Sequence, residues 1–269
     1  MRRSFAVLGT LLLGLTSVLS AHDMFLKLRS FFLAEHSPVI VSLLNGTFST
    51  SENSIDRNRI ADISLFTPEG RVRHDTSVVN ARGDSTFLSL ATEGPGTYVL
   101  GFSMRPSQLK ISGKEFADYL HEEGLTEVLD ARKKDGIAAD SASERYAKHV
   151  KAILQVGTTR TDGYAAVLGY PAELIPLDNP YSVKPGGSLR VRALVNGTPV
   201  PHLTVLAGGR STGDARLPVQ TLRTGSDGEA TVRIPRRGTY YVKFISMVKV
   251  TGGVTDYVSN WATLTFQVR

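Results

Sequence analysis

The segment SLRVRALVNGT, residues 188–198, carries the clearest structural signal in the chain. In the run from Ser188 to Leu194, polar and apolar side chains alternate as far as Ala193, which is the period-two pattern of a strand with one buried face. The pair Asn196-Gly197 follows, and this pair is typical of a two-residue β-hairpin turn. The segment therefore predicts an antiparallel hairpin.

The same pattern continues to the C-terminus. Strand-like runs follow at residues 204–206, 230–234, 239–248 and 262–268, with a tight turn at residues 226–228. Asp178-Asn179-Pro180 is a turn signal upstream of the hairpin and a candidate domain boundary. We therefore predict that residues 179–269 form an Ig-like β-domain with Greek-key-like spacing.

The first half of the chain also reads as short strands, separated by turns about every ten residues. They are expected at residues 24–28, 39–44, 60–67, 71–79, 87–90 and 97–102. The polar stretch from Asn45 to Arg59 has no apolar period and predicts an exposed loop. This spacing indicates a β-sandwich for residues 22–178.

Helical spacing interrupts that first sandwich. Ser112 and Glu115 form a capping box, and Gly124 is placed to end the helix, after which a second helix is expected from Thr126 to about Lys134. A third helix is expected from Asp140, because a second capping-box pattern opens it and an apolar stripe follows. The stripe comprises Tyr146, Val150, Ile153 and Leu154. The sequence thus predicts a mainly β protein with two β-sandwich (Ig-like) modules, the first carrying a helical insert from about residue 112 to about residue 155.

The N-terminus resembles a secretory signal peptide. Arg2 and Arg3 precede an apolar run that is too short to span a bilayer, and the small residues Ser20-Ala21 follow it. We therefore predict a signal peptide over residues 1–21, a periplasmic location and no transmembrane segment in the mature chain. A cut after Ala21 would make His22 the first residue, whereas a cut after Ser20 would make it the second.

Composition narrows the possible functions. The chain has no cysteine, so a bound metal would be held by nitrogen and oxygen alone. Removing Arg2 and Arg3 with the signal leaves 29 basic and 25 acidic residues, an excess too small and too scattered to indicate a nucleic-acid partner. The zinc motif H-E-x-x-H and a phosphate-binding glycine loop are missing, and we predict that the protein is not an enzyme.

His22 is the strongest candidate ligand. A histidine at a chain terminus offers its α-amine and a ring nitrogen to the same ion. One residue leaves coordination positions open, and we expect His74, on a strand of the same sandwich, and His149, on its helical insert, to supply further ligands. The other three histidines are read as solvated positions, in a loop, on a helix face and in a turn: His36, His121 and His202.

Five ordered segments together resemble the NikM-like family of exported bacterial proteins, a periplasmic component of nickel/cobalt uptake. The segments are Ala21-His22-Asp23; Phe116 to Leu125; Glu144 to Lys148; Glu173 to Leu177 with Asn179-Pro180-Tyr181; and Trp261 to Phe266. The resemblance implies two β-sandwich modules and a metal role for His22. The chain departs from that family at Ser246-Met247, where members often carry a His-Met pair, so a site that used that histidine is absent or altered.

Three functions follow as hypotheses. The first is a soluble binding protein for a divalent transition metal, nickel or cobalt by resemblance with copper possible, that acts with a membrane transporter complex. The second is a structural or adhesive β-sandwich module that binds protein or glycan without metal. The third is a copper-dependent oxidative enzyme with a terminal-histidine site.

Overall fold

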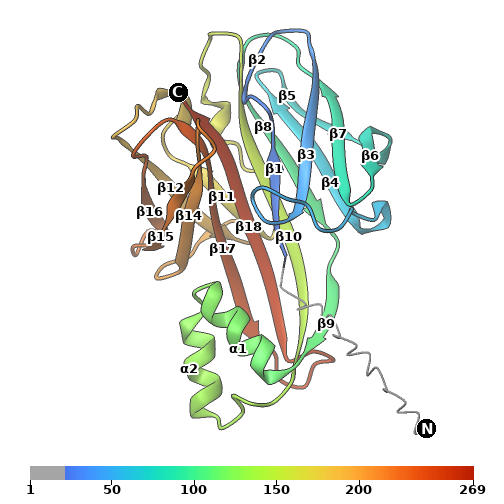
Figure 1. Ribbon diagram of the computed structural model, residues 1–269, viewed down its shortest axis with the longest axis vertical. Helices are drawn as coiled ribbons and strands as arrows, with labels where there is room; N and C mark the ends of the chain where they lie inside the picture. Colours follow the sequence, from blue (N-terminus) through green and yellow to red (C-terminus); the bar gives the residue numbers. More distant parts are fainter. Residues whose placement is uncertain (1–21) are drawn as a thin grey trace, which may run out of the picture.

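The computed structural model describes residues 22–269, so the signal peptide predicted for residues 1–21 lies outside the described part of the chain. The described chain is mainly β, as predicted (Figure 1). No helix within residues 22–269 combines the length and apolar character that crossing a bilayer requires.

The strands of residues 22–269 form three sheets. The first has the order β1 (Asp23–Lys27), β3 (Pro38–Gly46), β7 (Ser85–Ala91) and β6 (Val79–Arg82). The long central sheet begins with β15 (Arg216–Arg223), β14 (Thr204–Ser211), β17 (Gly238–Lys249) and β18 (Tyr257–Val268). It continues in order with β10 (Ala142–Val156), β8 (Gly96–Met104), β4 (Ile60–Thr67) and β5 (Gly70–His74). Two further strands, β2 (Phe32–Leu33) and β9 (Ser107–Ile111), also pair with β10. The third contains β11 (Ala172–Pro176), β12 (Ser188–Val195) and β13 (Thr198–Pro199), with β16 (Glu229–Arg233) on β12.

The predicted hairpins form where the turn chemistry placed them. Asn196 and Gly197 adopt φ angles of 50° and 77° between β12 and β13, and both positive values suit the turn that an Asn-Gly pair favours. β4 and β5 pair in the same way across the turn before Gly70. Local sequence thus sets these connections.

The central sheet joins the two predicted modules. β10 comes from the first and β18 from the second, and they pair in parallel from Glu144 opposite Tyr257 to Ala152 opposite Thr265. One buried apolar cluster includes residues of both, from Met24 to Val268. β11, which precedes the predicted boundary at residue 178, pairs with β12, which follows it. The two sandwiches therefore share a sheet.

The third predicted helix is wrong, because residues 142–156 form β10. β8 and β18 pair with its two edges, and every residue from Ala147 to Val156 is buried, so both faces of this part of the strand are covered. A strand buried on both faces loses the polar–apolar alternation that marks a half-exposed strand. The apolar stripe at helical spacing was therefore misleading, and the helical insert is limited to residues 113–134.

The two remaining helices match the prediction. α1 (Gly113–Glu122) has the Ser112–Glu115 capping box, and Gly124 follows it with a φ of 70°, which glycine adopts at low cost. α2 (Thr126–Lys134) comes next. Apolar side chains of α1 pack in one buried cluster with the lower ends of β17 and β18 (Figure 1); the cluster includes Phe116, Tyr119, Leu120, Ile245, Tyr257 and Trp261.

Candidate functional site

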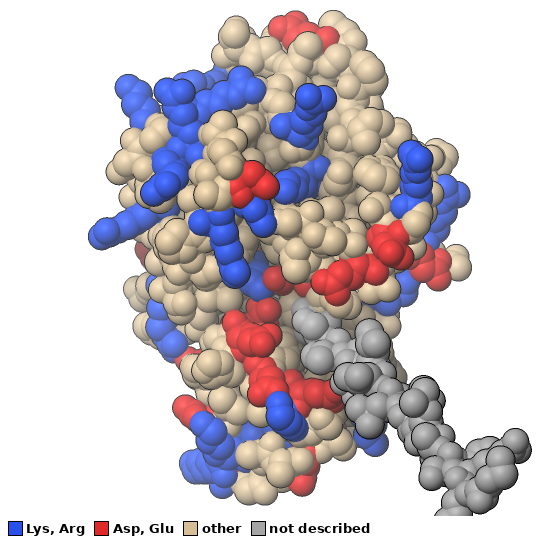
Figure 2. Space-filling view, viewed as in Figure 1, with Lys and Arg blue, Asp and Glu red and all other residues tan. Residues whose placement is uncertain are grey.

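A cleft of about 680 Å³ opens between α1, the start of β1, the loop after β3, and strands β14, β15 and β17. Figure 2 shows acidic side chains gathered across the middle of this face, and basic side chains above and to the left of them. The acidic lining comprises Asp23, Glu52, Glu115, Asp118, Glu122 and Glu123. The cleft therefore has one strongly negative wall.

His22 lies at this wall. Its Nδ1 is 3.2 Å from Oε2 of Glu52, and its Nε2 is 3.5 Å from the side-chain nitrogen Nδ2 of Asn53. A quarter of the His22 side chain is exposed, as is 45% of the Glu52 side chain, so solutes can reach both. The loop after β3 thus brings a carboxylate to the histidine that the sequence singled out.

A buried lysine fixes the residue after His22. Lys243 on β17 places its Nζ 2.6 Å from Oδ2 of Asp23 and 2.7 Å from Oε2 of Glu123. Burial opposes the charge on Lys243, but the two carboxylates outweigh it and raise the pKa of the amine. Burial, together with the charge of Asp23, raises the pKa of Glu123. The second oxygen of Asp23, Oδ1, is buried with no hydrogen-bond partner in the described chain.

Lys148 on β10 holds the backbone of His22 from the other side. Its ammonium group donates to the carbonyl oxygen of His22 and lies 5.2 Å from the ring centroid of Trp261. Burial lowers the pKa of Lys148 to about 8, although Asp23 opposes the shift. Two buried lysines from different strands therefore fix the start of β1.

Another part of the cleft lining is aromatic and basic. The rings of Phe25, Phe48 and Tyr241 meet with centroids 5.0 to 5.2 Å apart, and Arg210 and Arg216 lie beside them. Tyr241 is opposite Gly208 across β14 and β17, where a Cβ atom would sit 2.5 Å from the tyrosine hydroxyl. A larger residue at position 208 would have to displace the Tyr241 ring.

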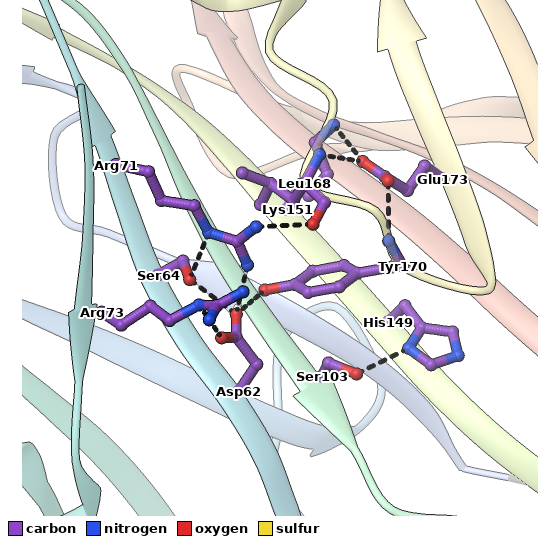
Figure 3. Close-up of polar contacts among 10 residues, drawn as sticks. All are labelled: Asp62, Ser64, Arg71, Arg73, Ser103, His149, Lys151, Leu168, Tyr170 and Glu173. Atoms are coloured by element: carbon purple, nitrogen blue, oxygen red, sulfur yellow. Dashed lines mark hydrogen bonds and ion pairs between the residues drawn. The ribbon is translucent and has the colours of Figure 1, made fainter. Parts of the chain in front are cut away.

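His149, predicted as a metal ligand, is buried away from His22. Its Nδ1 is 2.9 Å from the Ser103 hydroxyl (Figure 3), and its Nε2 is 3.3 Å from Oδ1 of Asn260. An amide oxygen only accepts, so Nε2 carries the proton and Nδ1 accepts from Ser103. Burial lowers the pKa of His149 to about 4, although the Asn260 bond opposes the shift. Because Lys148 faces His22, the next residue on the strand points to the other face of the sheet.

His74 does not join His22 either. It lies on β5, three strands from β10, which corresponds to roughly 14 Å at the spacing of neighbouring strands. Its Nε2 is buried without a hydrogen-bond partner in the described chain. The three ligands predicted from sequence therefore occupy separate places, and within residues 22–269 no three His, Asp or Glu side chains are grouped so that they could hold a metal.

The remaining histidines lie where the sequence placed them. His36 and His202 are turn residues with φ angles of 46° and 55°, and His121 is in the last turn of α1. Sequence reasoning missed the residues that surround His22, because Glu52, Glu123 and Lys243 come from distant segments. Only Asp23, which follows His22 in the chain, could have been predicted from the sequence to lie near it.

A second polar cluster lies between β10 and β11. Lys151 and Glu173 form an ion pair at 3.0 Å, and both side chains are only 2% exposed. Glu173 also accepts from the backbone amides of Leu168 and Tyr170, and the Tyr170 hydroxyl donates to Asp62 (Figure 3). The ion pair therefore links β10 of the central sheet to β11 of the third sheet.

The fold and the cleft define a β-sandwich protein with a ligand-sized, acid-walled cleft beside His22. The chain belongs to the DUF4198 family, described as a domain of unknown function, whose model matches residues 19–247. The search of curated proteins gave no significant match.

Solved structures similar to this chain include trypsin-activated alpha-2-macroglobulin from Escherichia coli, at 10% identity and a TM-score of 0.24, over 92% of this chain and 16% of that one. The native conformation of the same E. coli protein matches at 9% identity and a TM-score of 0.23, over 92% and 14%. A tetra-tandem repeat in the extending region of a large adhesion protein matches at 12% identity and a TM-score of 0.21, over 91% and 49%. The chain spans half or less of each, and nothing is transferred from them to its function.

Proposed function

We propose that this protein is an exported binding protein whose cargo is a divalent transition-metal ion, held at the acidic wall of the cleft by His22 and Glu52. The observation that carries the proposal is the pairing of the His22 ring with the Glu52 carboxylate at 3.2 Å, in an open cleft. Imidazole nitrogen and carboxylate oxygen are ligands that such ions accept.

The surroundings of this pair favour a cation. Asp23 has a buried oxygen without a partner one residue from His22, and further carboxylates of α1 line the same wall. A cation that entered there would offset the charge that these groups concentrate. If the signal peptide is cut after Ala21, the α-amine of His22 adds a second nitrogen from the same residue.

The identity of the ion and of its recipient rests on the NikM-like resemblance. That resemblance favours nickel or cobalt as cargo and a membrane transporter complex as recipient, in the periplasm. The ligands themselves suit nickel, cobalt, copper and zinc alike, because geometry and supply decide among these ions more than ligand affinity.

Titration calorimetry with Ni²⁺ tests the proposal on exported, processed protein whose N-terminus has been determined by mass spectrometry. We expect His22→Asn to weaken binding at least tenfold, and Glu52→Gln to weaken it less. Binding should also weaken as the pH falls, because protons compete for the same nitrogens.

His36→Asn is the matched control. His36 also lies beside a carboxylate, Glu93, at 3.7 Å, but on an exposed turn outside the cleft, and asparagine tolerates its positive φ. Equal affinity of the parent and His22→Asn would place the metal elsewhere. A parent protein that binds no ion would instead favour the structural or adhesive hypothesis.

A further inference from the structure

The cleft is much larger than the proposed cargo. Its volume of about 680 Å³ is in the range of sites that take small organic molecules, roughly 300–1,000 Å³, whereas a bare ion and its ligands fill a small part of that. The protein also offers the ion few ligands, since no group of three His, Asp or Glu is assembled within residues 22–269. The cleft therefore has room for a molecule larger than an ion, and an ion bound there would keep coordination positions that the protein does not fill.

The wall of the cleft that carries Arg210 and Arg216 has a chemistry that no cation requires. Arg210 is partly satisfied by Asp214 at 3.4 Å and by the Ser49 hydroxyl at 2.6 Å. Arg216 lines the cleft and has no ion-pair partner within residues 22–269. A guanidinium group presents a planar fork of donors that matches a carboxylate, so this wall is suited to an organic anion.

The aromatic part of the lining is suited to the body of such a molecule. Phe25, Phe48 and Tyr241 pack against one another and line the same cleft as the acidic and the basic residues. Ligand sites commonly combine an apolar lining with a few placed polar groups that orient the ligand.

We propose that the cleft binds its metal ion as a complex with a small carboxylate-bearing chelator. The ion faces His22 and Glu52, and a free carboxylate of the chelator faces Arg216. The inference rests on the proposed function and extends it, because the chelator supplies the ligands that the protein lacks. No bond to the chelator is made or broken; the metal exchanges solvent ligands for His22 and Glu52.

The experiment compares three probes on the full processed protein by calorimetry and native mass spectrometry: Ni²⁺ alone, citrate alone, and the Ni²⁺–citrate complex. We expect the complex to bind at least tenfold more tightly than Ni²⁺ alone, and native mass spectra to show protein, metal and citrate in one species. Arg216→Ala should weaken binding of the complex about tenfold, the scale of one charge-assisted hydrogen bond, and leave binding of Ni²⁺ alone unchanged.

Arg233→Ala is the matched control, since this arginine lies on β16 in the same sandwich, removes the same charge, and does not line the cleft. Arg216→Lys keeps the charge without the planar fork and should give an intermediate loss. Equal losses of affinity from Arg216→Ala and Arg233→Ala would overturn the inference, because the change in net charge alone would then explain both.

The remaining outcomes separate the inference from the proposed function. Binding of Ni²⁺ alone, with no gain from citrate, overturns the inference and leaves the proposed function standing. Binding of citrate alone as tightly as the complex overturns the metal-bridged arrangement. Absence of binding by both Ni²⁺ and its complex overturns the inference together with the proposed function.

Discussion

Acidification should destabilise this protein through His149. The imidazole is 3% exposed and is neutral in the fold, where burial lowers its pKa from 6.5 to about 4. In the unfolded chain the ring takes up a proton near its ordinary pKa, so between those two values the unfolded state binds more protons than the folded state. The stability contributed by the neutral ring is therefore complete above pH 6.5 and is lost as the pH falls towards 4.

The size of the effect follows from the shift. Each pKa unit corresponds to about 1.4 kcal/mol, so a shift of this size amounts to about 3 kcal/mol of unfolding free energy. This is a large part of the roughly 5–15 kcal/mol by which a domain is usually stable.

Urea unfolding at a series of pH values from 7.5 to 4.5 measures the effect. The single tryptophan, Trp261, is buried and its fluorescence reports unfolding. His149→Gln removes the titrating ring, so its stability should fall with pH less steeply than that of the parent. His121→Gln is the control, because His121 lies exposed in the last turn of α1. If the parent and His149→Gln lose stability in parallel, or if NMR titration places the His149 pKa near 6.5, the reasoning fails.

Three further substitutions test the rest of the structure. Lys151→Met leaves Glu173 buried without its counter-charge and should lower the unfolding free energy by about 3–5 kcal/mol in the same urea assay; a loss below 1 kcal/mol would mean that Glu173 is solvated or protonated. Ser112→Ala removes the side-chain cap of α1 and should cost about 1 kcal/mol, and an unchanged midpoint would show that the cap contributes nothing. Lys148→Met removes the donor to the His22 carbonyl and should weaken Ni²⁺ binding with the fold retained; unchanged affinity would show that this bond does not position His22.

The sequence alone determined what depends on neighbouring residues. Asn196-Gly197 specifies its hairpin because only a few residue pairs accept two positive φ angles in succession. Ser112 and Glu115 specify the start of α1 because they bond each other's backbone groups within one turn. The mainly β class follows in the same way from alternating side chains, since burial on one face repeats every second residue.

Only the tertiary structure decided what depends on contacts between distant segments. Residues 142–156 became a strand because they pair with β8, β9 and β18, and burial on both faces removed the alternation by which a strand is recognised. The same burial places His149, a candidate ligand from the sequence, among hydrogen-bond partners inside the protein. The surroundings of His22 come from Glu52, Lys148 and Lys243, which meet where β1 packs against the central sheet, and the farthest of these contacts spans more than 200 residues of chain. Spacing along the sequence carries no record of such contacts, because the energy that selects them arises only when the sheets pack.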